Sequence, residues 1–219
     1  MIQTLVKPVR SQLQISNCRD VSIPVAQADI PSHHDNLLRG LIKSNFIKHG
    51  LDIDYKISGV VGLLNKHDQS INPGRLRTMD KSRIVIRLAS DEHANQVAEL
   101  FSARKLGLGI DSITTGAAEI YSLNPCSKLY SYCFFTKRIT DSVEMHQYLT
   151  NKLCQMGVEA RVDIIQPRVV VINQGKILRG FSVLLSGLTD EDSLYIQSIV
   201  DNSFGGKGHY GCSFWKHGK

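Results

Sequence analysis

The pattern of apolar and polar residues predicts a definite order of elements in the first half of the chain. Apolar residues from Leu37 to Phe46 recur at the spacing of one helix face, and residues 83–88 (RIVIRL) alternate as in a half-buried strand. A polar loop at 67–81 precedes that strand. The predicted elements are a strand at 21–28, a helix capped by Ser32 that runs to about 48, strands at 53–61 and 83–88, a helix at 91–105 and a strand at 112–123. The order is βαββαβ.

The second half of the chain repeats this order after a predicted linker at 124–127 (NPCS). Asp141 is suited to cap a helix, and Gly157 is suited to end it in a left-handed conformation. The predicted elements are a strand at 129–137, a helix at 141–156, a bent strand over 159–165 and 168–173, a strand at 176–187, a helix at 190–202 and a strand at 210–215. We therefore predict an α+β fold of two tandem ferredoxin-like modules, 19–123 and 128–219, each an antiparallel sheet with its helices on one face.

Composition narrows the class of protein. With 219 residues, of which 42% are hydrophobic, the chain can bury its cores without metal or disulfide bonds. Its five cysteines include no CxxC pair, which favours a reducing compartment and argues against a zinc ribbon. We expect a cytoplasmic protein without a membrane partner, because no apolar run approaches the length of a membrane span. A net charge of +6 favours a polyanionic partner such as nucleic acid.

A glycine-rich segment, FGGKGHYGCSFW (204–215), precedes the last predicted strand. Glycines present bare backbone amides, which suit contact with a phosphate, and basic side chains lie between them. The alternative is a tight structural connection into an edge strand. The residues predicted to contact phosphate here are Gly205, Gly206, Lys207, Gly208 and His209.

Residues 176–215 resemble the C-terminus of a known family. KILRGFSVLLSGLTDEDSLYIQSIVDNSFGGKGHYGCSFW is similar to the end of the CRISPR-associated endoribonucleases that process repeat RNA, the Cas-six family of the RAMP superfamily. These proteins end with a strand, "SGL", a helix near "EDSL", and a glycine-rich loop followed by "GCG" or "GFG". Residues 20–41 (DVSIPVAQADIPSHHDNLLRGL) are similar to the family's opening strand, turn and first helix, so the resemblance spans about 20–219.

The sequence departs from the family pattern at three places. The final Gly-x-Gly is 211–213 (GCS), so its second glycine is replaced by Ser213. The Asp-His pair of the first turn is replaced by His33-His34, with the acid displaced to Asp35. The "Leu-His" that often follows the first helix is 48–49 (KH).

The resemblance implies a metal-independent endoribonuclease that needs no cofactor. Family members let a 2′-hydroxyl attack the adjacent phosphate, which leaves a 2′,3′-cyclic phosphate and a 5′-hydroxyl. This reaction needs a base, an acid and stabilisation of the negative charge, and histidine suits either proton transfer. The implied substrate is the stem-loop of a CRISPR repeat in precursor RNA, and the implied product is a guide RNA retained with other subunits of an effector complex.

By the same resemblance, His49 and His34 are the candidate catalytic residues, with His49 first because it matches the family position after the first helix. They lie 15 residues apart, over about 20 Å along a straight helix, so both cannot contact one phosphate. His34 is then suited to orient RNA, and Arg39 or Lys48 to stabilise charge. Taken without the resemblance, His49 is a helix-end residue favoured by the helix dipole and His34 a surface residue.

Basic residues of the second module are expected to contact the RNA backbone. The candidates are Lys137, Arg138, Arg161, Arg168 and Arg179. Two other functions stay open: a catalytically inactive guide-RNA-binding subunit of a CRISPR effector complex, and a small-molecule-binding ferredoxin-like regulator. The first would bind RNA hairpins without cutting them, and the second would show no salt-sensitive affinity for RNA.

Overall fold

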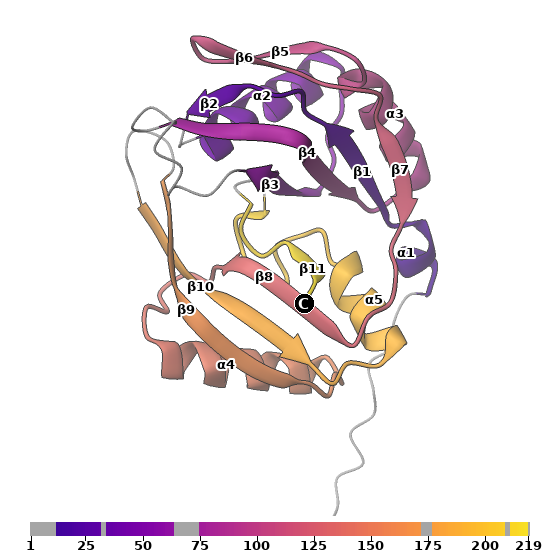
Figure 1. Cartoon of the computed structure of the whole chain (residues 1–219). Coiled ribbons are helices and arrows are strands. Elements are labelled where there is room, and N and C mark those ends of the chain that lie inside the picture. Colours follow the sequence, from indigo (N-terminus) through magenta and orange to yellow (C-terminus); the bar gives the residue numbers. More distant parts are fainter. Residues whose placement is uncertain (1–11, 32–33, 64–74, 172–176, 209–210, 219) are drawn as a thin grey trace, which may run out of the picture.

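Two larger antiparallel sheets with helices packed against them form the α+β fold in Figure 1. The computed structural model describes residues 12–31, 34–63, 75–171, 177–208 and 211–218. Its elements are α1 (Gln12–Asn17), β1 (Arg19–Pro24), β2 (Asp29–Pro31), α2 (His34–Lys48), β3 (Tyr55–Leu63), β4 (Arg75–Leu88), α3 (Asp91–Phe101), β5 (Lys105–Leu108), β6 (Asp111–Thr114), β7 (Glu119–Ser122), β8 (Lys128–Phe134), α4 (Ser142–Gln155), β9 (Arg161–Val171), β10 (Ile177–Ser186), α5 (Asp190–Ser198) and β11 (Trp215–His217).

The two larger sheets repeat one strand order. The first runs β3-β4-β1-β7, and the short β2 pairs with the beginning of β4. The second runs β9-β10-β8-β11. In both, the second strand of the repeat pairs with the third, the third with the first, and the first with the fourth. The predicted α+β fold of ferredoxin-like type is thus confirmed, while the boundaries 19–123 and 128–219 stay a prediction.

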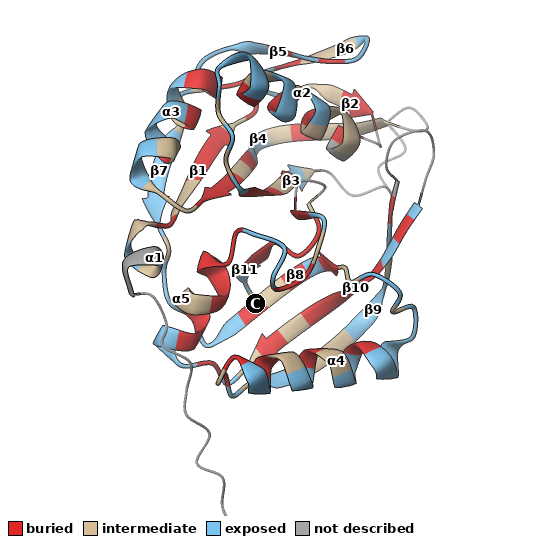
Figure 2. Cartoon of the chain, turned by 180° about the vertical axis from the view of Figure 1, so that it is seen from behind, coloured by how far each residue is buried: buried red, intermediate tan, exposed pale blue. Residues whose placement is uncertain are grey.

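Amphipathic helices cover the outer face of each sheet. Helices α2 and α3 pack on the first sheet around a core that includes Ile57 and Ile86. Helix α4 packs on the second sheet, where Leu149 joins a separate cluster with Val183. Figures 1 and 2 show α2, α3 and α4 on the sides of their sheets that point away from the other sheet. The opposite faces of the two sheets are therefore turned towards each other.

Strand β4 begins at Arg75, so residues 75–81 are strand where the polar pattern predicts a loop. Pairing with β2 draws this stretch into the first sheet, and ion pairs satisfy its two arginines. Arg75 lies 2.8 Å from a carboxylate oxygen of Asp111, and Arg77 lies 2.9 Å from one of Asp29. These long-range pairs explain why a polar segment is extended.

The predicted strand at 112–123 is two strands in the structure. Strand β6 forms a two-stranded ribbon with β5, and β7 alone joins the first sheet beside β1. The chain bends between them at Gly116, whose N–H donates to the carbonyl of Pro24 at 2.9 Å and whose carbonyl accepts from Ala103 at 2.8 Å. Helix α3 ends at Phe101, four residues earlier than 91–105 predicts, and β5 begins at Lys105.

The second module follows its prediction more closely. Asp141 caps α4 by accepting from the N–H groups of Val143 and Glu144, and Gly157 follows the helix with a φ of 66°. Within the described residues, the predicted bent strand is one continuous strand, β9, whose register shifts opposite β10. Helix α5 ends four residues before its predicted end, and β11 begins only at Trp215.

The segment before β1 contains a short helix, α1. Its first eleven residues lie outside the described part of the chain.

Candidate functional site

His49 lies directly after α2 and lines a pocket on the helix side of the first sheet. Its N–H still bonds to the carbonyls of Asn45 and Phe46, so the helix holds its backbone while its side chain is exposed. The pocket has a volume of about 280 Å³ and is lined by His49, Leu51, Gln96, Glu99, Leu100 and Arg104.

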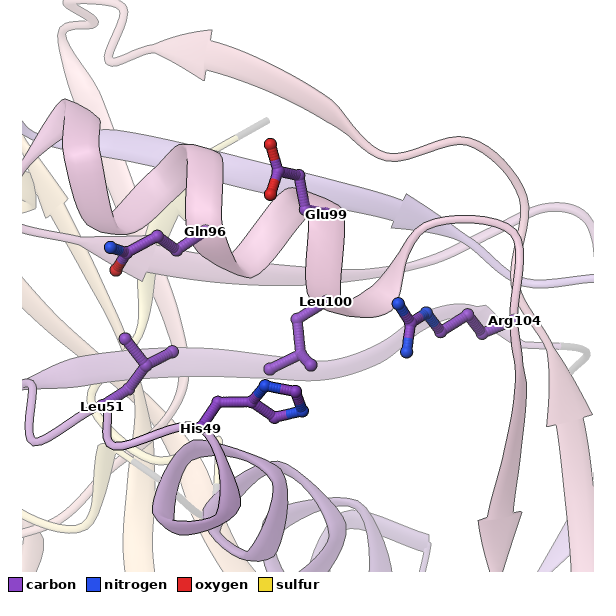
Figure 3. A pocket seen from close by; sticks show the side chains of 6 residues that line it. All are labelled: His49, Leu51, Gln96, Glu99, Leu100 and Arg104. Carbon is purple, nitrogen blue, oxygen red and sulfur yellow. The ribbon is translucent and has the colours of Figure 1, made fainter.

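Figure 3 shows the His49 imidazole and the Arg104 guanidinium pointing towards each other, with Leu100 above the ring. An accessible imidazole can transfer a proton, and a nearby guanidinium can stabilise negative charge on a phosphate. Arg104 follows α3, far from His49 in the sequence, and it was not among the residues predicted for the site. No pattern in the sequence pairs these two residues, because packing of α2 beside α3 brings them together.

His34 has a different environment from His49. Its side chain is only 5% exposed, and Nδ1 lies 3.1 Å from the carbonyl oxygen of Pro31. Since a carbonyl only accepts hydrogen bonds, Nδ1 carries the proton of this bond. His34 and His49 lie at opposite ends of α2, so the structure does not bring the two histidines together. Arg39 is half-buried on the same helix, and Lys48 is exposed beside His49.

The predicted cations of the second module lie on the second sheet and its turns. Lys137 and Arg138 are exposed after β8, and Arg179 is exposed on β10. Arg161 pairs with Asp163 at 3.0 Å, which offsets its charge. The Arg168 guanidinium lies 4.3 Å from the centre of the Tyr132 ring. The structure thus separates these residues from the His49 pocket, and their contact with RNA stays a prediction.

Close packing explains two glycines of the glycine-rich segment. A Cβ on Gly205 would lie 2.3 Å from Oγ of Ser213, and one on Gly208 would lie 2.5 Å from Cγ of Lys56. The N–H of Gly206 donates to the carbonyl of Phe135 at 2.8 Å, whereas Lys207 is exposed. His209 lies outside the described residues. Phosphate contact by this segment stays a prediction, and Lys207 is the described side chain most available for it.

Ser213 occupies the position at which the family pattern has its second glycine. Its φ is 55°, in the left-handed region that favours glycine, and its side chain is buried. The hydroxyl lies 3.1 Å from the carbonyl of Gly206 and 3.3 Å from the N–H of Phe135. The serine therefore keeps the glycine-like conformation and links the glycine-rich segment to the end of β8.

Lys56 is a buried lysine next to the glycine-rich segment, and it was not among the residues predicted for the site. It lies on β3, is 2% exposed, and its Nζ lies 3.4 Å from the carbonyl of Phe204. Burial lowers the pKa of Lys56 to about 7, and the charge of Arg87 acts in the same direction, whereas Asp201 opposes them. A polar residue between Tyr55 and Ile57 fits an exposed strand face, so the sequence alone gave no reason to expect burial.

Replacing Lys56 with methionine should stabilise the protein near neutral pH. The unfolded lysine holds its proton up to about pH 10.5, whereas the native amine loses it near pH 7. Between these values the unfolded state binds more protons, so the unfolding free energy of the wild type should rise with pH. Methionine has no titrating group, so it removes this pH dependence together with the cost of burying the amine. The unfolding free energy at pH 7, measured by urea unfolding, should rise by about 2 kcal/mol.

The control for this experiment is Lys43→Met, which changes an exposed lysine on α2. This variant should keep the wild-type pH dependence. A wild-type unfolding free energy that stays flat between pH 7 and pH 10 would show that Lys56 is charged and well paired in the folded protein.

A larger hollow of about 820 Å³ lies between the two sheets. Its walls come from β1, β3, β4 and β7 on one side and from α5 and the C-terminal residues on the other. The charged groups along it have both signs, and they include Asp20, Arg83, Glu119 and Lys216. This hollow is separate from the pocket that His49 lines.

In the part of the chain that the structure describes, none of the helices has the length and apolar character that a membrane span requires. The same residues include no group of three or more His, Cys, Asp or Glu side chains that could hold a metal ion.

Comparison with known proteins identifies one family. The family model described as "Cas6 Crispr" matches residues 20–217. The CRISPR-associated endonuclease Cas6 of Myxococcus xanthus (strain DK1622) is 29% identical over 103 residues, which are 47% of this chain. That match spans only 43% of the length of the relative.

Solved structures agree on the fold at low sequence identity. A CRISPR-associated protein Cas6 matches with a TM-score of 0.62 and 12% identity, covering 93% of this chain and 100% of the other. A Cas6-related protein from Pyrococcus furiosus matches with a TM-score of 0.60 and 14% identity, covering 92% and 98%. A RAMP protein described as binding different RNA substrates matches with a TM-score of 0.61 and 12% identity, covering 91% and 98%. Because the family model covers nearly the whole chain and these structures share its fold, the chain belongs to the Cas6 family of CRISPR proteins.

Proposed function

We propose that this protein is a metal-independent endoribonuclease that binds the stem-loop of a CRISPR repeat and cuts the precursor RNA at the 3′ base of the stem. Membership of the Cas6 family supports this, as does the endonuclease activity in the name of the Myxococcus relative. The observation that carries the proposal is the exposed His49 at the end of α2, in a pocket that Arg104 shares.

The proposed reaction is an internal transfer at phosphorus. The 2′-hydroxyl attacks the adjacent phosphorus atom and loses its proton, and the bond from phosphorus to the 5′-oxygen breaks as that oxygen gains a proton. The products are a 2′,3′-cyclic phosphate and a 5′-hydroxyl. His49 transfers one of these two protons, and Arg104 stabilises the additional negative charge on the phosphate oxygens.

RNA binding is proposed to extend beyond this pocket. Exposed cations on the second sheet and Lys207 on the glycine-rich segment would contact the phosphates of the hairpin. Among the neighbours, the CRISPR endoribonuclease Cse3 was solved bound to a 19-nucleotide RNA, with a TM-score of 0.51 to this chain. We further propose that the protein acts in the cytoplasm as two modules, 19–123 and 128–219, and keeps its product within an effector complex.

The test uses labelled repeat RNA in excess EDTA, with a matched RNA that carries one 2′-deoxy nucleotide at the cut site. We expect cutting in EDTA, a cyclic phosphate at the new 3′ end, and no cutting of the deoxy substrate, because it lacks the attacking oxygen. A reaction that EDTA stops and Mg²⁺ restores would contradict metal independence.

Two other outcomes would indicate the alternative functions. Tight, salt-sensitive binding of the hairpin without cutting would identify an inactive guide-RNA-binding subunit. The buried His34 and the replacement of a family glycine by Ser213 are the observations that favour this second function. A protein without salt-sensitive RNA affinity would instead fit a small-molecule regulator.

A further inference from the structure

Arg87 is a buried cation on the face of the first sheet that is turned towards the second. Its side chain is 3% exposed, and it pairs with Asp20, the residue directly opposite on β1. Nε and Nη2 each lie 2.7 Å from one oxygen of that carboxylate. This two-point geometry holds the plane of the guanidinium in one orientation.

The remaining nitrogen of Arg87 reaches across to the second module. Nη1 donates to the carbonyl of Trp215 at 2.8 Å and lies 3.4 Å from the carbonyl of Gln197. The guanidinium also lies 4.5 Å from the centre of the Phe214 ring. Phe214 and Trp215 end the glycine-rich segment, so one side chain of the first sheet contacts both the last residues of this segment and helix α5.

The beginning of the glycine-rich segment is held from the neighbouring strand. Lys56 on β3 is directly opposite Arg87 on β4, and its Nζ lies 3.4 Å from the carbonyl of Phe204. Phe204 and Trp215 in turn stack, with ring centres 5.7 Å apart. Two adjacent buried basic side chains therefore contact the two ends of the segment 204–215.

We propose that Arg87 is a positioning residue that sets the place of the glycine-rich segment 204–215 relative to the first sheet. Asp20 orients its guanidinium, and the hydrogen bond to Trp215 transmits that orientation to the segment. Its effect on RNA cleavage rests on the proposed function, whereas its effect on the segment does not. Because Arg87 is buried, it acts without touching RNA.

The chemistry of arginine explains why lysine is a poor substitute. A guanidinium donates to both oxygens of Asp20 and to the carbonyl of Trp215 in one plane. An ammonium keeps the charge but lacks the planar fork, so it cannot reproduce all three contacts. Arg87→Lys should therefore hold the glycine-rich segment less firmly than the wild type and more firmly than Arg87→Met.

Amide hydrogen exchange on the RNA-free full-length protein tests the positioning itself. We expect Arg87→Met to speed exchange within 204–217 by about tenfold or more, while α4 keeps its protection. Arg83→Met is the matched control, since Arg83 is an exposed residue four positions earlier on the same face of β4. Asp20→Asn, which keeps the arginine but weakens its orientation, gives a second variant if Arg87→Met does not fold.

The cleavage assay then tests the consequence for RNA. With repeat RNA, Arg87→Met should lower the single-turnover cleavage rate by about 10–100-fold. The dissociation constant of the RNA complex should change by less than about threefold. The cleavage rate of Arg87→Lys should lie between those of the wild type and Arg87→Met. Unchanged exchange in 204–217 for both Arg87→Met and Asp20→Asn would overturn the positioning role. Faster exchange with a wild-type cleavage rate would overturn its link to catalysis. If the wild type itself does not cut, the proposed function fails, and the exchange result alone decides the positioning role.

Discussion

His49→Ala should lower the single-turnover rate of repeat-RNA cleavage by about 10²–10⁴-fold, the usual contribution of a general acid or base. His49 is exposed at the end of α2, so its truncation removes a proton-transfer group without opening the core. RNA affinity should stay within about threefold, because many phosphate contacts elsewhere supply it. The cleavage rate is measured at a saturating concentration of protein. The RNA affinity is measured separately, as a dissociation constant from filter binding. Added imidazole should restore part of the lost rate.

Two other histidine variants make this result specific. His146→Ala alters an exposed histidine on α4 and should cut like the wild type. His34→Ala removes a buried ring bonded to Pro31, so it should lower the unfolding free energy by about 1–3 kcal/mol. A folded His34→Ala protein that has lost cleavage, beside a His49→Ala protein that cuts normally, would move the catalytic role to His34. Wild-type rates in both variants would show that neither histidine is catalytic.

The strand and helix order was predictable because most of it depends on local patterns. Helix α4 carries its own start and stop signals in Asp141 and Gly157, and both act as predicted. The beginning of β4 was not predictable, since Arg75 and Arg77 are stabilised by carboxylates on other elements. Such pairs leave no periodic pattern in the sequence.

The candidate site was predictable only in part, for a related physical reason. The family position makes His49 a candidate, whereas no pattern in the sequence marks His34 as buried. Alternation at residues 83–88 marks one face of β4 as polar, yet it does not show what covers that face. Lys56 and Arg87 are buried because described residues of the glycine-rich segment, among them Phe204 and Trp215, lie against them. This contact joins strands to a segment more than a hundred residues away.

Gly205→Ala should lower the unfolding free energy by about 3 kcal/mol or more, the combined cost of a strained backbone and an overpacked site. Gly205 has a φ of 80°, and an added Cβ would lie 2.3 Å from Oγ of Ser213 and 2.6 Å from Cε2 of Phe134. Both neighbours are buried and cannot move aside freely. Urea unfolding followed by far-UV circular dichroism measures the loss.

Gly187→Ala separates the two parts of this cost. Gly187 has nearly the same φ, 77°, but nothing lies within 4 Å of its added Cβ, so only the backbone strain of about 1 kcal/mol applies. The double variant Gly205→Ala/Ser213→Gly should recover part of the loss, because it removes the nearest atoms. Equal losses at Gly205 and Gly187 would mean that packing does not require the glycine at 205. The glycine would then be required only for its backbone conformation. Reduced RNA affinity in a stable Gly205→Ala protein would support direct phosphate contact by the segment.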